Sequence, residues 1–260
     1  MVTPDLKKGE DFFVYYLNAA HQNGIEWLKK LKGVPCNKAI IQLNDIFTEL
    51  SSRKFDSSDA KDEVMPHFIL RSRAAYLAGV RLAISGQSVE AYPILRLCLE
   101  FSLYAYFIFV DKNSVEVDHD SEKIKVPERF MIWLDRRKDA ESKRLFLKTF
   151  TMGNLKGAIS EVDKKLGDIV GNLYDNLIDF GAHPNFETIL GHQENEGGLQ
   201  ISYFLPPTED IHKKCIQDLA STGICALLIF RWMYKEFFDI VNLTQQLDLL
   251  KSAMPKTFKS

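Results

Sequence analysis

The longest apolar stretch of the chain lies near its middle, from Leu97 to Val110, where almost every side chain is apolar. A helix that is apolar on all sides is normally buried in a protein core or in a membrane. The stretch is shorter than the roughly 20 residues that a membrane-spanning helix needs. Because Arg96 and Glu100 lie at its start, the pattern favours a central core helix, and Ser88 is the expected N-cap.

Apolar residues recur at helical spacing through most of the remaining chain. This spacing predicts helices over residues 11–31, 37–50, 62–84, 159–178, 208–241 and 243–252, and a helical stretch that Pro127 opens. The stop signal at Ser85-Gly86 makes the helix 62–84 and the central helix an antiparallel hairpin. Two prolines disturb the pattern: Pro66 predicts a break in the first helix or its entry, and Pro93 predicts a distorted first turn in the second, or a start near Tyr92.

Two segments lack the helical period. Residues 111–125 are charged and aperiodic, so they are expected to form a loop. Residues 188–190 and 199–204 flank a polar segment that ends in Gly197-Gly198, a pattern typical of a hairpin. The sequence therefore predicts an all-α helical bundle of about seven helices with one small β-hairpin near residues 187–204. We expect a single domain over 1–260, with N-terminal helices in 1–55 packed on a core bundle of 62–241.

Composition and charge exclude several classes of protein. The 260 residues are 46% hydrophobic and carry a net charge of −2, so no overall field attracts nucleic acid or anionic lipid. No signal peptide or spanning segment is evident, and the expected location is the cytoplasm, with no membrane partner. The chain lacks the Walker loop, the Gly-x-Gly-x-x-Gly motif, the His-Glu-x-x-His motif and the nucleophile elbow.

The four cysteines form no Cys-x-x-Cys pair, which favours buried free thiols in a reducing compartment over disulfides. His212 and Cys215 lie one helical turn apart and could share a metal ion. No second pair of ligands accompanies them, so we expect neither a metal site nor a cofactor.

Arg96 and Glu100 lie four residues apart on the central helix and share one face. Their apolar neighbours imply burial, and buried charges need partners. One interpretation is a buried ion pair that fixes the helix register; the other is a polar pocket in the bundle interior. Arg71, on the preceding helix, either is solvated or lines an anion site near Glu100.

Two further features have a structural and a functional interpretation. The basic run from Arg136 to Lys148 has aromatic neighbours and suits an RNA backbone, but interspersed acids also fit a solvated helix face. His183 follows a helix end, where it is either a structural loop residue or an acid–base group.

Short motifs in the central and later helices resemble an uncharacterised bacterial helical family related to HEPN-like bundles. The first motif joins Gly86 and Glu90-Ala91 to a Leu-Arg-x3-Glu helix that contains Arg96 and Glu100, and the second runs from Tyr174 to His183. Many HEPN proteins are ribonucleases of toxin or phage-defence systems, with an arginine shortly before a histidine on one helix. No histidine of this chain has an arginine at that position, and only His183 could take the place of the family's histidine.

The leading hypothesis is a bacterial, cytoplasmic, non-catalytic binding or interaction module for an anionic or nucleotide-like ligand. It is expected to be a homodimer and to have an RNA or protein partner. The expected ligand-binding residues are Arg71, Arg96, Glu100, Tyr174 and Asn185. The alternative is a HEPN-like metal-independent endoribonuclease, in which His183 is the catalytic acid–base group and Arg96 stabilises the phosphate.

Overall fold

The computed structural model describes residues 18, 21–22, 24–26, 29, 35–53, 60–119, 122–181, 193–194, 200–201 and 209–253. Ten helices have bounds within this part of the chain. They are α2 (Pro35–Ser51), α3 (Ala60–Ile84), α4 (Ser88–Phe109), α5 (Glu128–Leu134), α6 (Ala140–Thr149), α7 (Met152–Val162), α8 (Lys164–Gly181), α10 (Glu209–Met233), α11 (Lys235–Ile240) and α12 (Leu243–Ala253). The predicted all-α class is confirmed, and the division of expected helices at Asp163 and Tyr234 raises the number above seven.

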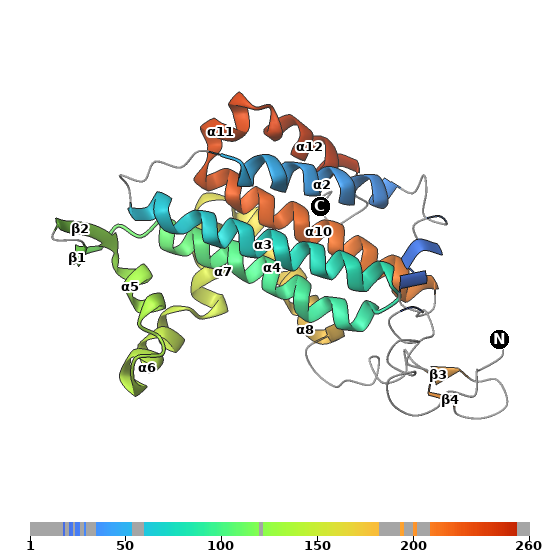
Figure 1. Ribbon diagram of the computed structural model, residues 1–260, viewed down its shortest axis with the longest axis horizontal. Helices are drawn as coiled ribbons and strands as arrows, with labels where there is room; N and C mark the ends of the chain where they lie inside the picture. The colour runs from blue at the N-terminus through green and yellow to red at the C-terminus, as the bar shows by residue number, and fades with distance from the viewer. Residues whose placement is uncertain are drawn as a thin grey trace.

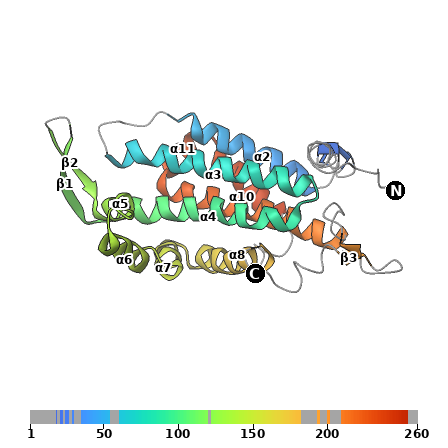
Figure 2. The ribbon, with the colours of Figure 1, turned by 60° about the horizontal axis from the view of Figure 1, so that its bottom comes forward.

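The helices form a layered bundle around α4 and α10. Helix α3 runs antiparallel to α4, and α10 packs against both of them (Figure 1). Helices α2 and α3 cover one side of the α4–α10 pair, while α7 and α8 cover the other side (Figure 2). Buried side chains from all of these helices join one hydrophobic cluster. Its centre includes the fully buried Leu95, Cys98 and Leu99 of α4, where the apolar pattern predicts a core helix.

Proline does not interrupt either helix of the α3–α4 hairpin. Pro66 lies inside α3 and Pro93 inside α4, so the expected break and the expected late start are wrong. Each proline removes one backbone hydrogen bond, and burial of the neighbouring residues keeps the helix continuous. The N-cap of α4 is Gln87, and Ser88 is the first helical residue rather than the cap.

Two helices, α4 and the His212–Met233 part of α10, are long and apolar enough to cross a membrane. Most of each of these segments is buried inside the bundle. A core helix of a soluble protein has the same length and composition, so these two properties are weak evidence for a membrane span.

The expected loop at 111–125 is wrong, because most of it belongs to an antiparallel hairpin. Strand β1 (Ser114–His119) pairs with β2 (Glu122–Pro127), with Val115 opposite Val126 and Val117 opposite Ile124. The apolar residues alternate with charged ones, which is a strand period that the high charge conceals. The hairpin projects from one end of the bundle beside α5 (Figure 1).

The hairpin expected near residues 187–204 is present as two very short strands. Strand β3 (Gln193–Glu194) pairs with β4 (Gln200–Ile201) in antiparallel register. The rest of that segment lies outside the described residues.

Three helix boundaries differ from the expected ones. The helix expected over 159–178 is divided at Asp163, whose carboxylate accepts a hydrogen bond of 2.9 Å from the Leu166 amide and so starts α8. Helix α7 begins at Met152, before the expected Ile159, and the Thr151 hydroxyl caps it. The helix expected over 208–241 is divided at Tyr234, between α10 and α11.

Three cysteines, Cys98, Cys215 and Cys225, are free and buried, and burial raises the pKa of each thiol to about 12. The His212–Cys215 metal site gains no support, because no group of three metal-ligating side chains occurs among the described residues. The side chain of Cys36 lies outside them.

Candidate functional site

Arg96, Glu100 and Tyr174 form a polar cluster between α4 and α8. The Nε atom of Arg96 lies 3.4 Å from Oε1 of Glu100, and the same oxygen accepts a hydrogen bond of 2.9 Å from the Tyr174 hydroxyl. The side chains of Arg96 and Glu100 are 29% and 21% exposed. The pair therefore exists as the spacing predicts, but it lies at the surface of the bundle rather than in an interior pocket.

Tyr104 connects this cluster electrostatically to Arg136, which lies between α5 and α6. Burial raises the pKa of Tyr104, and the Glu100 carboxylate raises it further. Arg136 and Arg96 lower this pKa, so both positive charges lie within electrostatic reach of the Tyr104 ring. Arg136 thus comes to the same face of α4 as the predicted Arg96–Glu100 pair.

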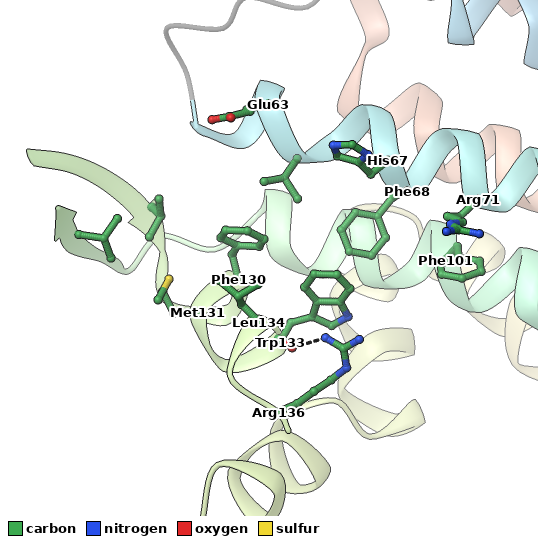
Figure 3. Close-up of a pocket in the computed structure, with 13 residues that line it drawn as sticks. Glu63, His67, Phe68, Arg71, Phe101, Phe130, Met131, Trp133, Leu134 and Arg136 are labelled. Atoms are coloured by element: carbon green, nitrogen blue, oxygen red, sulfur yellow. Dashed lines mark hydrogen bonds between the residues drawn. The ribbon is translucent and has the colours of Figure 1, made fainter. Parts of the chain in front are cut away.

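A cavity of about 760 Å³ lies beside this face, between α3, α4, the β1–β2 hairpin and α5 (Figure 3). We call it the aromatic pocket. Its lining residues are Glu63, Val64, His67, Phe68, Arg71, Phe101, Val117, Val126, Phe130, Met131, Trp133, Leu134 and Arg136. The volume falls within the range of small-molecule sites.

The pocket takes its name from four aromatic side chains on three helices. The Trp133 ring lies 5.1 Å from the Phe68 ring and 6.1 Å from the Phe130 ring, measured between centroids. Phe101 of α4 contributes the fourth ring. The Phe68–Trp133 contact joins α3 to α5 and fixes the width of the pocket at this point, so the rings form a wall that exists without a ligand.

Positive groups outnumber negative ones in the lining. Arg136 is held by two contacts: its Nη1 donates a hydrogen bond of 2.6 Å to the Trp133 carbonyl, and its guanidinium lies 4.3 Å from the Trp133 ring centroid. Arg71 and His67 come from the exposed side of α3, and among the described residues Glu63 is the one carboxylate that lines the pocket. The site thus combines apolar rings with a partly immobilised arginine, a set of groups that suits a flat anion.

The predicted site residues do not all come together. Arg96, Glu100 and Tyr174 make direct contacts, whereas Arg71 lines the aromatic pocket and forms no ion pair with Glu100. His183 and Asn185 lie outside the described residues. Helix α8 ends before them at Gly181. Gly181 packs closely on α4, because a Cβ atom at this position would lie 2.6 Å from Cδ of Pro93.

Sequence reasoning did not assemble the aromatic pocket. Phe130, Trp133 and Arg136 stand in one short segment, but Phe68 is more than sixty residues earlier. Arg136 follows the end of α5, and a basic residue there can donate to the last carbonyls of the helix, which is a signal for its contact with Trp133. The β1–β2 wall could not be expected once its segment was interpreted as a loop.

Comparison of the chain with protein-family models, curated proteins and solved structures finds no match. The pocket and its neighbouring polar cluster are therefore the basis for assigning a function.

Proposed function

We propose that this protein is a non-catalytic binding module for an anionic, nucleotide-like ligand, which the aromatic pocket holds. The observation that supports this proposal best is that four aromatic rings and two arginines, Arg71 and Arg136, line a single cavity. An aromatic ring binds a nucleobase by stacking, worth about 1–3 kcal/mol per base. Arginine binds phosphate through paired hydrogen bonds.

The state of Arg136 favours ligand binding over a purely structural role. Its contacts with the Trp133 carbonyl and ring fix the guanidinium before a ligand arrives, so less side-chain entropy is lost on binding. Only one Nη is used by the Trp133 carbonyl, and the remaining N–H groups can donate to phosphate oxygens.

The Arg96–Glu100–Tyr174 cluster adds a third arginine, Arg96 of α4, to Arg71 and Arg136 of the pocket. Glu100 holds the Nε side of Arg96, while Tyr174 fixes Glu100. In our proposal this cluster orients Arg96 toward the part of the ligand that extends beyond the pocket.

The three buried free thiols support the expected reducing, cytoplasmic location. The bacterial source, the homodimer and an RNA or protein partner rest on the sequence alone. Size-exclusion chromatography with light scattering tests the dimer directly.

Isothermal titration with AMP and GMP tests the proposed function. The variants Trp133→Leu and Arg136→Gln remove a wall and a charge of the pocket, and each is expected to weaken binding by tenfold or more. Trp232→Leu and Arg144→Gln are matched controls, because Trp232 is on α10, Arg144 is on α6, and neither lines the aromatic pocket. Circular dichroism identifies any variant that fails to fold.

Two outcomes would contradict the proposal. The first is that neither nucleotide binds at millimolar concentration. The second is that the pocket variants bind the nucleotides as tightly as their controls do. Cleavage of RNA in the presence of a chelator, lost in His183→Ala, would instead support the endoribonuclease alternative.

A further inference from the structure

Three polar side chains of α3 follow one another along the aromatic pocket. Glu63, His67 and Arg71 are spaced four residues apart, so they form one stripe on the helix, and all three line the cavity. The helical rise separates the first from the third by about 12 Å along the axis. This stripe gives the pocket an acidic end and a basic end.

The opposite wall adds one positive group, Arg136. Figure 3 shows Glu63 at one end of the pocket, with Arg71 and Phe101 at the other, while Arg136 lies below Trp133, away from Glu63. The ring of Phe68 lies between these ends, and Phe130, Val117 and Val126 add apolar surface to the lining. A ligand that fits this arrangement has an anionic group, a flat apolar-faced ring, and hydrogen-bond donors on the far edge of that ring.

We infer that the ligand is a guanine nucleotide, with the phosphate at Arg71 and Arg136 and the base edge at Glu63. This inference rests on the proposed function and specifies its ligand. A carboxylate is only an acceptor when ionised. The guanine edge offers two adjacent donors, N1–H and the N2 amino group, which match the two oxygens of one carboxylate.

Adenine is the wrong base for this site. Its N1 atom is an acceptor and faces the carboxylate with a lone pair, so the Glu63 oxygens lose a donor that guanine supplies. A site built to hydrogen-bond a donor group discriminates strongly against the analogue that lacks it, because its polar group is left unpaired. Glu63 is exposed in the free protein, so the base itself must cover the carboxylate when it binds.

Titration of the full chain with GMP, IMP and AMP tests the inference. IMP keeps the N1–H donor and lacks the N2 amino group. We expect GMP to bind at least tenfold more tightly than AMP, with IMP between them. In Glu63→Gln the ratio of the AMP and GMP dissociation constants is expected to fall to within about twofold of one.

The control variant is Glu49→Gln, an exposed carboxylate of α2 that does not line the pocket, and it should keep the preference for GMP. Equal affinities for GMP and AMP in the wild-type protein would overturn the guanine inference and leave the proposed function standing. A preference for GMP that survives in Glu63→Gln would also overturn it. Failure of all three nucleotides to bind would reject the proposed function itself.

Discussion

The hydroxyl of Tyr174 donates a hydrogen bond to Oε1 of Glu100 across 74 positions of sequence, at 2.9 Å. The bond joins α8 to α4 at the edge of the bundle, and Arg96 contacts the same oxygen. Burial and the Glu100 carboxylate raise the pKa of Tyr174, because both favour the neutral phenol. Tyr174 is therefore a donor throughout the range in which proteins are normally studied.

Removing the hydroxyl measures what this bond contributes. Tyr174→Phe is expected to lower the free energy of unfolding by about 0.5–1.5 kcal/mol, the usual net value of one hydrogen bond. Urea denaturation followed by circular dichroism measures the change. Asp179→Asn, at an exposed position of α8, is the control and should alter the stability by less than about 0.5 kcal/mol. A Tyr174→Phe protein as stable as the wild type would show that the contact contributes nothing.

His212 predicts a pH dependence of stability. It is buried at 0% exposure on α10, and burial lowers its pKa from the ordinary 6.5 to about 4. Between these values the unfolded chain binds a proton that the folded protein does not. The stability that neutral burial of His212 preserves is therefore fully present above pH 6.5. The free energy of unfolding should fall as the pH falls toward 4, by an amount on the order of a few kcal/mol.

Urea titrations at pH 7.5, 5.5 and 4.5 measure this slope. Carboxylates also titrate near the lower limit, so the comparison is between variants at each pH. His212→Leu should have a shallower slope between pH 6.5 and 4.5 than the wild type, whereas Gln217→Leu, at an exposed position of α10 that does not titrate, should keep the wild-type slope. Identical slopes in all three proteins would contradict the assignment.

Two glycines of the α7–α8 pair form a matched test of packing. A Cβ atom at Gly167 would lie 3.1 Å from Cα of Ser160, whereas a Cβ atom at Gly157 would meet nothing within 4 Å. Gly167→Ala should destabilise the protein by about 1–3 kcal/mol, because α7 and α8 would have to separate. Gly157→Ala should stabilise it by up to about 1 kcal/mol, because alanine favours the helix. The difference in denaturation midpoint checks both, and equal effects would show that the helices are not in close contact.

The sequence predicts the long helices well because their signals agree with one another. In the α3–α4 hairpin, apolar periodicity ends at Ser85-Gly86, and Gly86 has the positive φ of 82° that such a stop requires. Helix breaks inside an apolar pattern are not predictable in the same way. The spacing of Ile159 and Leu166 continues across Asp163, and Val162 between them is 45% exposed. A side-chain cap and the packing of α7 on α8, rather than the hydrophobic period, determine that break.

For a related reason, only one part of the candidate site can be predicted from the sequence. The Arg96–Glu100 pair is local, and an i, i+4 spacing is enough to find it. The aromatic pocket is not local, since its walls come from α3, α4, the β1–β2 hairpin and α5. Finding it requires the relative placement of these elements, which packing of Phe68 on Trp133 establishes.

The buried cysteines give the protein its own probes of unfolding. Alkylating reagents attack the thiolate, and Cys98, Cys215 and Cys225 are both inaccessible and protonated while the bundle is closed. Their modification must therefore wait for α4 or α10 to open. Mass spectrometry of a timed alkylation would then report separate opening rates for these two helices, without any probe being engineered into the chain.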